Sequence, residues 1–274
     1  MGLFDRRLEI KTREQVELMR VSGRLVGETL ELLRAAVRPG ATTRELDTLA
    51  ETNIRDHGGV PSFLGYGFPP FPATICASVN DEVVHGIPGD RVLQDGDVVS
   101  IDCGAIVDGW HGDAAVTVAV GDVAPEVLEL MRVTEDALWH GMAAARLGGR
   151  VGDISHAVET HVRSQGRYGI LEEYTGHGIG TEMHMEPSVP NVGRRGRGAT
   201  LVEGLVLAVE PMVTAGSKHT HVLEDEWTVA TDDGSMSAHF EHTFTLTPEG
   251  PWVLTAVDGG AARLGELGIA AGGS

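Results

Sequence analysis

The residues best placed for chemistry are two aspartates, Asp102 and Asp113, on either side of an Asp108-Gly109 dipeptide. Asp-Gly between largely apolar runs is a strong signal for a two-residue hairpin turn. With the turn there, Asp102 faces Ala115 and Asp113 lies two residues along the same face, so the two aspartates are diagonal neighbours, about 7–8 Å apart at the backbone. Both carboxylates could then reach one pair of metal ions about 3.5–4 Å apart. The alternative for these two residues alone is that one of them faces solvent or caps a turn.

Three more side chains could complete such a site. Glu210 ends an apolar run just before a proline, where its carboxylate could project from a sheet edge. Alternation along 238–246 places Glu241, together with His239, on the polar face of a strand. His177 lies among three glycines, which let the backbone approach closely and leave the imidazole free to face a site. Because a His-Gly segment alone is more often a loop without a role, the metal hypothesis depends on four acids and a histidine occurring together.

Four predicted helices position these segments. Apolar residues at helical spacing, bounded by caps and by glycine or proline, place the helices at about 12–39, 42–58, 125–148 and 153–166. Thr12 with Gln15 and Thr42 with Glu45 are capping-box pairs, and Asp153 is expected to cap the fourth helix. Each half of the chain has a long helix, a breaker, a short helix and then a His-Gly-Ile segment. This order indicates an architectural duplication.

Predicted strands follow each pair of helices. They cover 98–107 and 110–120 around the Asp108-Gly109 turn, then 205–209, and a second hairpin of 227–231 and 238–246 around 232–234. Helices in runs followed by antiparallel hairpins indicate an α+β fold, in which the helices cover one face of a curved sheet. We expect one domain over 9–257, a flexible N-terminus over 1–8 and a flexible, glycine- and alanine-rich C-terminal tail over 258–274.

Composition limits the partners and the compartment. The 274 residues carry a formal charge of −19, with 40 acidic residues against 21 lysines and arginines, so the chain should repel nucleic acid and anionic membranes. Any contact with nucleic acid must therefore be local. The two cysteines, Cys76 and Cys103, are expected to be buried free thiols, which favours a reducing compartment. Since the sequence has neither an apolar signal segment nor an apolar stretch of about 18 residues, a soluble cytoplasmic protein is expected.

Six segments carry a resemblance to a known family: NDEVVHGIP at 80–88, SIDCG at 100–104, HGD at 111–113, TGHGIG at 175–180, VEPM at 209–212 and FEHT at 240–243. In this order, from about Glu9 to about Val253, they resemble the signature segments of type I methionine aminopeptidases. The resemblance implies the pita-bread fold, an α+β domain of two pseudo-symmetric halves. The short interval between Glu210 and Glu241 is similar to type I rather than type II enzymes. Without an extension before Glu9, the chain resembles the short bacterial form.

The resemblance also implies a metal centre and a reaction. Its ligands would be Asp102, Asp113, His177, Glu210 and Glu241, holding two divalent metal ions (Co, Mn, Fe or Zn). Asp113 and Glu241 would bridge the ions, and an oxygen-rich set with one imidazole favours Mn, Fe or Co over a structural zinc. A water shared by the ions would become a hydroxide nucleophile near neutral pH, with Glu210 as general base. The implied activity is hydrolysis of the N-terminal methionine from nascent proteins and peptides with a small second residue.

Two non-ligand histidines and a pocket complete the implied site. By resemblance, His184 donates to the scissile carbonyl oxygen as negative charge develops, and His85 contacts the scissile amide and helps the leaving nitrogen accept a proton. The loop at 65–72 departs from the family pattern, because it lacks a middle histidine and carries extra prolines. Which of the nearby phenylalanines line the pocket therefore stays open. The residues expected to bind the substrate are Tyr66, Phe68, Cys76, His85, His184 and Trp227.

Two rival functions share part of this evidence. A proline-specific aminopeptidase or prolidase would use the same metal ligands, although such relatives usually carry an N-terminal domain for which this chain has no room. A non-catalytic protein that keeps the fold would be expected to have lost ligands, whereas all five are present here. The expected partners are nascent peptide N-termini, and the protein is expected to be a monomer. The basic loop at 194–197 is expected to be solvated, with transient ribosome contact as the alternative.

Overall fold

The computed structural model describes residues 8–273, and its first two helices begin at the predicted capping boxes. At the start of α1 (Arg13–Ala36), the Thr12 hydroxyl accepts the Gln15 backbone N–H at 3.3 Å, and the Gln15 side chain accepts the Thr12 N–H at 2.8 Å. The predicted pair at the start of α2 (Thr43–Asp56) does the same at 3.1 and 2.8 Å. These local bonds satisfy N–H groups that the first helical turn leaves unpaired.

The second pair of helices is α3 (Pro125–Ala144) and α4 (Val151–Gln165), and α4 begins differently from the prediction. Its N-cap is Arg150, and Asp153 lies at the third helical position. The Asp153 carboxylate accepts the Arg150 backbone N–H at 2.8 Å. Asp153 thus stabilises the start of the helix without being its cap.

Every strand pair among the described residues is antiparallel, and the strands form three sheets. The strands are β1 (Val60–Pro61), β2 (Ile75–Val79), β3 (Glu82–Val84), β4 (Val98–Val107), β5 (Trp110–Ala119), β6 (Gly169–Ile170), β7 (Gly176–Gly178), β8 (Met185–Val189), β9 (Val206–Val209), β10 (Met212–Thr214), β11 (Thr220–Val222), β12 (Val229–Thr231), β13 (Ser237–His239), β14 (Glu241–Thr247) and β15 (Gly250–Val253). The large sheet has the order β1-β4-β5-β14-β9-β7-β8, with β2 also paired to β4 and β15 to β14. The small sheets are β13-β10-β6 and β11-β12-β3.

The first predicted hairpin is confirmed, including its register. Asp108 and Gly109 join β4 to β5 at positive φ values of 49° and 81°, the backbone that a tight two-residue turn requires. Asp102 pairs with Ala115, as predicted. Asp113 pairs with Gly104, two positions along, so the two aspartates point to the same face of the sheet.

The second predicted hairpin is wrong. Strand β12 pairs with β11 and β3, whereas β13 pairs with β10, and β14 pairs with β5, β9 and β15. A break at Phe240 divides the predicted strand at 238–246 into β13 and β14, which belong to different sheets. Nearly all side chains of this segment are buried on both faces, so its alternating pattern predicted extended backbone but could not select a partner.

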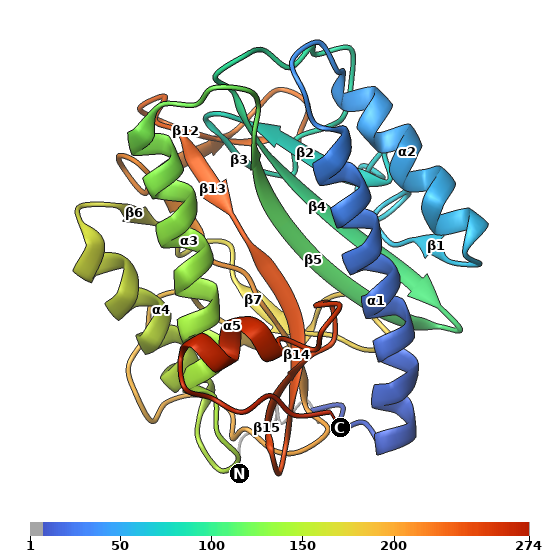
Figure 1. The fold of residues 1–274 in the computed structure, drawn as a ribbon, viewed down its shortest axis with the longest axis vertical. Coiled ribbons are helices and arrows are strands. Elements are labelled where there is room, and N and C mark those ends of the chain that lie inside the picture. Colours follow the sequence, from blue (N-terminus) through green and yellow to red (C-terminus); the bar gives the residue numbers. More distant parts are fainter. Residues whose placement is uncertain (1–7, 274) are drawn as a thin grey trace.

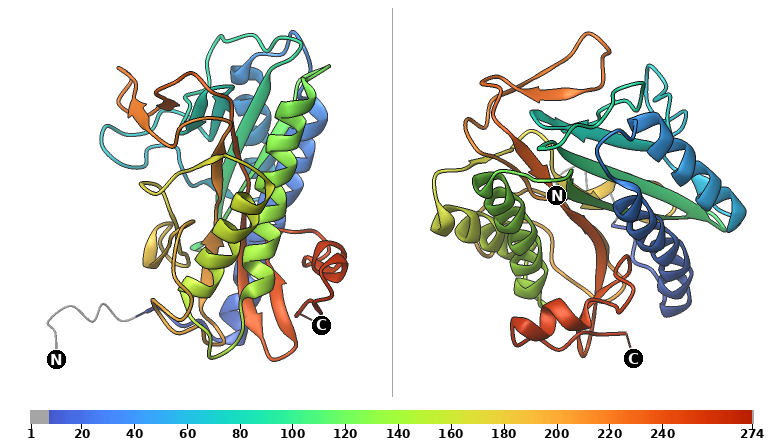
Figure 2. Two further views of the ribbon diagram at one scale, coloured as in Figure 1. Left: turned by 90° about the vertical axis from the view of Figure 1, so that its left-hand side faces the viewer. Right: turned by 45° about the horizontal axis from the view of Figure 1, so that its top comes forward.

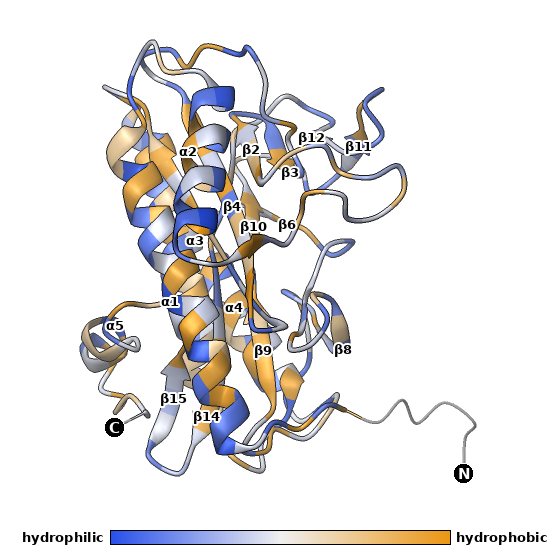
Figure 3. Ribbon diagram, turned by 90° about the vertical axis from the view of Figure 1, so that its right-hand side faces the viewer, coloured by the Kyte–Doolittle hydropathy of each residue, from blue (hydrophilic) through white to orange (hydrophobic). Residues whose placement is uncertain are grey.

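Helices α1, α2 and α3 lie on one side of the molecule, and long loops lie on the other (Figures 1 and 2). Helix α1 covers β4 and β5 of the large sheet, whereas α3 packs against β13 and β10 of a small sheet as well as β9 and β14 of the large one. The α1/α2 pair and the α3/α4 pair flank the sheet on opposite sides of Figure 1, in line with the predicted duplication. Hydrophobic and hydrophilic residues alternate along α1, which is the pattern of a helix with one buried face (Figure 3). Val26 and Leu33 of α1 and Leu130 of α3 are fully buried against the sheet.

The C-terminal segment differs from the flexible tail expected over 258–274. It contains helix α5 (Ala261–Glu266), whose Leu264 is fully buried in the main core. Arg263 donates to Asp136 of α3 at 2.7 Å. Glycine and alanine content suggested fraying, but one buried leucine and one ion pair hold the segment against α3.

Three further predictions concern the chain ends, the cysteines and membrane-spanning helices. Residues 1–7 of the predicted flexible N-terminus lie outside the described residues, and the domain limits at 9 and 257 stay predictions. Both Cys76 and Cys103 are buried free thiols, as predicted. No helix within residues 8–273 has the length and apolar character needed to cross a bilayer.

Candidate metal centre

The five side chains implied as metal ligands come together around one cavity of about 320 Å³. Gly112 of β5 touches α1, so the side chain of the next residue, Asp113, points to the opposite face of the sheet. The cavity therefore lies on the face away from α1. The residues that surround it come from four strands and one strand end: Asp102 of β4, Asp113 of β5, His177 of β7, Glu241 of β14 and Glu210 directly after β9.

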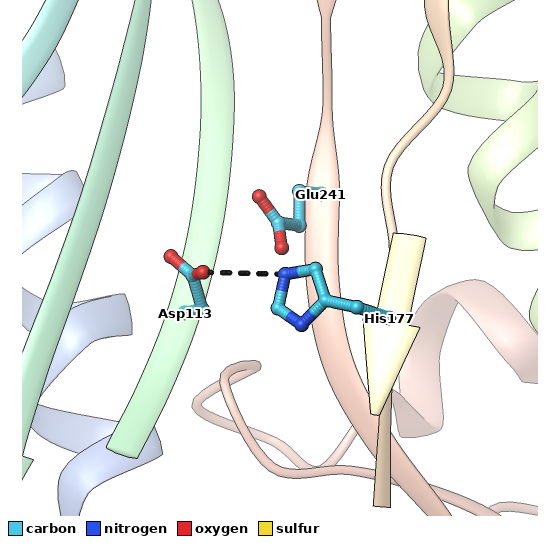
Figure 4. A group of neighbouring side chains, drawn as sticks. All are labelled: Asp113, His177 and Glu241. Carbon is cyan, nitrogen blue, oxygen red and sulfur yellow. Dashed lines mark ion pairs between the residues drawn. The ribbon is translucent and has the colours of Figure 1, made fainter. Parts of the chain in front are cut away.

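Asp113, His177 and Glu241 converge from three strands, as Figure 4 shows. One ligand atom from each lies within 4.8 Å of the others. The Nε2 atom of His177 lies 3.8 Å from Asp113 Oδ2 and 3.6 Å from Glu210 Oε1. The other ring nitrogen, Nδ1, is 2.9 Å from the carbonyl oxygen of Gly178 and donates to it. This contact leaves the Nε2 lone pair facing the carboxylates, the arrangement typical of a metal-binding histidine.

Burying four carboxyl groups together raises the pKa of each. Desolvation is the largest cause, and it raises the pKa of Asp102 to about 7 and that of Glu210 to about 8. The pKa values of Asp113 and Glu241 lie well above their ordinary range, because neighbouring carboxylates add repulsion to desolvation. Ionised carboxylates in such surroundings require a compensating positive charge.

The hydrogen-bonding state of these oxygens indicates what that charge would be. Asp102 Oδ1, Asp113 Oδ1 and Glu241 Oε1 are buried and have no hydrogen-bond partner among the described residues. Within residues 8–273, no lysine or arginine side chain lines the cavity. A set of acceptor-only oxygens with an imidazole lone pair fits divalent cations, so the residues present suit the metal ions that the resemblance implied.

A second histidine faces the same carboxylates, although the sequence did not mark it as a site residue. His239 of β13 is 2% exposed. Its Nε2 atom lies 3.9 Å from Glu210 Oε2 and 3.8 Å from Glu241 Oε2. The sequence feature that could have identified His239 is its position, two residues before Glu241 on the predicted polar face.

His85 and His184 lie beside the ligands on the cavity wall. The His85 ring packs edge-on against Tyr174 and Trp227, with centroids 5.6 and 5.9 Å apart, and desolvation lowers its pKa to about 4. The His184 ring centroid is 4.4 Å from that of His177. Both histidines are therefore adjacent to the space that a substrate would occupy.

The Tyr66 hydroxyl lies 2.6 Å from His184 Nδ1. A phenol is a much stronger acid than the N–H of a neutral imidazole, so Tyr66 donates and Nδ1 accepts. This hydrogen bond leaves the His184 proton on Nε2, the nitrogen that is free to donate to another group.

Of the residues predicted to bind the substrate, Phe68 does not line the cavity. Its side chain is 97% exposed, whereas Phe63 and Phe71 are buried in the lining. The backbone explains the difference: Gly65 and Gly67 both have positive φ, and the Phe71 N–H donates to the Tyr66 carbonyl at 2.8 Å, so the loop turns Phe68 outward. The predicted residues that do line the cavity are Tyr66, Cys76, His85, His184 and Trp227.

Comparison with known proteins agrees with the predicted family and fold. Residues 17–248 match the model of metallopeptidase family M24. The methionine aminopeptidase of Clostridium acetobutylicum is 49% identical over 90% of this chain and 98% of its own length. Methionine aminopeptidase 1 of Mycobacterium tuberculosis is 50% identical over 88% of this chain and 92% of its own.

Solved structures give the same result. The methionine aminopeptidase of Rickettsia prowazekii superposes with a TM-score of 0.88 at 42% identity, covering 91% of this chain and all of that one. A prolidase from Pyrococcus furiosus superposes with a TM-score of 0.71 at 21% identity, over 90% of this chain and 65% of the prolidase, and shares the fold alone. The pita-bread fold predicted from the six segments is therefore confirmed. The chain belongs to metallopeptidase family M24 and, within it, to the methionine aminopeptidases.

Proposed function

We propose that this chain uses two divalent metal ions to hydrolyse the N-terminal methionine from peptides and nascent proteins whose second residue is small. One observation carries the proposal most directly. Four carboxylates and an imidazole, from four strands and the end of a fifth, surround one cavity, and three of their buried oxygens receive no hydrogen bond from any described residue. Such a cluster is costly to bury without cations.

The ions would be held by Asp102, Asp113, His177, Glu210 and Glu241, with Asp113 and Glu241 shared between them. When bound, divalent ions at this position would polarise a substrate carbonyl and lower the pKa of a water molecule. The four carboxylates make the set oxygen-rich, which favours Mn, Fe or Co over a structural zinc.

The protein's own residues then perform the proton transfers. Glu210 follows β9 with its side chain 14% exposed, and it takes up the proton of the attacking water. His184 donates from Nε2 to the carbonyl oxygen as negative charge develops, held in that tautomer by Tyr66. His85 contacts the scissile amide and helps the leaving nitrogen to accept a proton.

Selectivity for methionine follows from the chemistry of the lining. Phe71 and Trp227 pack edge-on at 5.2 Å, and Cys76 is buried beside them. A thioether contacts aromatic edges favourably, so methionine suits this wall better than a polar or charged residue. Trp227 and the Tyr66 loop also limit the space available to the second residue, which explains a requirement for a small side chain there.

The decisive experiment varies the first and second residues of a peptide separately and measures kcat/KM with Mn(II), Fe(II) or Co(II). Efficient cleavage is expected for Met-Gly, Met-Ala and Met-Ser peptides, and very poor cleavage for Met-Leu, Met-Lys and Met-Phe peptides. Comparable values for Met-Ala and Met-Leu, or for Met-Ala and Leu-Ala, would contradict the proposal. A prolidase-like enzyme would instead prefer proline second and tolerate any first residue.

The metal requirement has its own test. Asp113→Ala and Glu241→Ala each remove a carboxylate that both ions would share, so each variant should lose turnover together with bound metal. Near-wild-type activity in either variant, with its metal content measured, would contradict the dinuclear site.

We also propose the setting in which the enzyme acts. It would work as a cytoplasmic monomer on emerging N-termini, and its overall negative charge restricts ribosome contact to local basic patches. The loop at 194–197 is exposed and carries three arginines, so it is the candidate for such a contact. Cosedimentation with ribosomes, compared between the wild type and a variant with all three arginines replaced by alanine, would test this.

A further inference from the structure

His239 occupies a position that packing alone does not explain. It is 2% exposed, and its buried Nε2 atom has no hydrogen-bond partner in the part of the chain that the structure describes. Leaving a buried polar atom unpaired destabilises the folded state, so an apolar residue would stabilise this position better if the ring only filled space. The unpaired nitrogen instead faces the carboxylates of Glu210 and Glu241.

The surroundings of His239 repeat those of His177. His177 Nε2 lies 3.8 and 3.6 Å from two carboxylate oxygens, and His239 Nε2 lies 3.9 and 3.8 Å from two others. Glu210 stands between the two imidazoles, with Oε1 toward His177 and Oε2 toward His239. The two histidines thus approach the carboxylate cluster from its two sides.

These distances suit shared coordination better than direct hydrogen bonding. A nitrogen and an oxygen 3.8–3.9 Å apart are beyond hydrogen-bond distance. Two donors that are each about 2.1 Å from one ion can be up to about 4.2 Å apart, so the separations at His239 fall within the range that a common ion allows. One ligand atom from each of Glu210, His239 and Glu241 lies within 4.8 Å of the others.

The backbone holds His239 firmly in this position. Its N–H donates to the Thr117 hydroxyl at 2.9 Å, and the same hydroxyl donates to the His239 carbonyl at 2.8 Å. Pairing of β13 with β10 places His239 opposite Met212, which lies two residues after Glu210 in the chain. A ligand on a fixed backbone needs little rearrangement to bind an ion.

We infer that His239 is a sixth ligand of the metal centre, binding through Nε2 to the ion that Glu210 and Glu241 hold. The inference rests on the proposed dinuclear centre and adds a second imidazole to it. A donor set of two imidazoles and four carboxylates shifts preference away from Mn(II) and toward Fe(II), Co(II) and Zn(II), which bind imidazole more strongly.

The first test uses the unmodified chain loaded with Co(II). Each histidine bound through Nε2 carries an exchangeable N–H on Nδ1, whose proton resonance the paramagnetic ion shifts far outside the ordinary range. The wild type should show two such resonances that disappear in deuterated water. A single resonance would overturn the inference, because it would leave His177 as the sole imidazole ligand.

The second test measures Co(II) and Mn(II) affinity by calorimetry on metal-free proteins. His239→Gln should weaken one of the two binding steps by about tenfold or more for Co(II), and less for Mn(II). The matched control is His242→Gln, which removes a half-buried histidine of β14 that pairs with the Thr255 hydroxyl at 2.8 Å instead of facing the carboxylates. Its metal affinities should equal those of the wild type.

An Asp113→Ala variant distinguishes an error in the role of His239 from an error in the dinuclear centre itself. If it loses metal while His239→Gln binds both ions as tightly as the wild type, the centre stands and the role of His239 is refuted. If Asp113→Ala also binds both ions normally, the dinuclear centre itself is wrong. Thermal denaturation of each metal-free variant shows whether it is folded before its affinity is compared.

Discussion

Replacing Asp102 by asparagine should stabilise the metal-free protein, and the gain should grow as the pH rises. In the folded chain without metal, desolvation raises the pKa of Asp102 from 3.8 to about 7. Between these values the folded state holds a proton that the unfolded state has released, so the free energy of unfolding falls as the pH rises. Asparagine has nearly the same shape and does not titrate, so it removes this loss.

The magnitude follows from the width of this pH window. Each pH unit inside it changes the free energy of unfolding by about 1.36 kcal/mol. Between about pH 5 and pH 7, the advantage of Asp102→Asn over the wild type should increase by about 3 kcal/mol, and above about pH 7 it should level off. For a chain of this length, that corresponds to an increase of about 6 °C in the difference between the two thermal midpoints.

The assay is thermal denaturation of both metal-free proteins from pH 5 to pH 8. The result to compare is the difference between the two thermal midpoints, because burial lowers the pKa values of His177 and His239 to about 3 in the folded protein. Those histidines make stability rise with pH in both proteins alike, so their effect cancels. Added Mn(II) should raise the midpoint of the wild type at pH 8 more than that of the variant, which lacks one ligand charge. A difference that stays constant or shrinks between pH 5 and pH 7 would refute the reasoning.

Three further changes test other parts of the site and fold. His184→Ala should keep its metal ions, measured by elemental analysis, and lower kcat by about 100-fold or more, because a donor to the developing oxyanion is lost; loss of metal or a change in KM alone would disprove this role. Tyr66→Phe removes the hydroxyl that holds His184 Nδ1 at 2.6 Å and should lower kcat by about tenfold, the scale of losing an orienting partner. An effect confined to KM would instead assign Tyr66 to methionine binding. Leu264→Ala should lower the free energy of unfolding by about 2–3 kcal/mol with KM unchanged, and an unaltered thermal midpoint would show that α5 contributes little.

Local rules predicted the parts of the fold that depend on neighbours in sequence. The Asp108-Gly109 turn set the β4–β5 register, and with it the shared face of Asp102 and Asp113, because a two-residue turn allows only one pairing. The capping box at Thr12 likewise depends only on residues three positions apart. Residue types alone could not select the ligands among 40 acidic side chains, and the choice required the resemblance of the six segments.

The errors arose where distant segments decide the outcome. Alternation put His239 on the face of Glu241, but its approach to Glu210 depends on β13 pairing with β10, which no local pattern specifies. In the same way, the glycine- and alanine-rich C-terminal segment is held by contacts with distant elements, through Leu264 in the main core and the ion pair of Arg263 with Asp136. Phe68 is an exception, because its outward turn depends on two neighbouring glycines in left-handed conformations.

The packing of α1 explains why the sheet can hold the carboxylates in fixed positions. A Cβ added at Gly112 would lie 2.7 Å from the Gly23 backbone nitrogen, and one added at Gly23 would lie 2.5 Å from the Leu254 carbonyl oxygen. The helix therefore contacts the backbone of β5 directly, with no side chain between them. Gly112 immediately precedes Asp113, so this contact fixes the strand beside one of the proposed metal ligands. Metal sites require ligand positions accurate to about 0.5 Å, and a helix pressed against the strand backbone supplies that accuracy from the far side of the sheet.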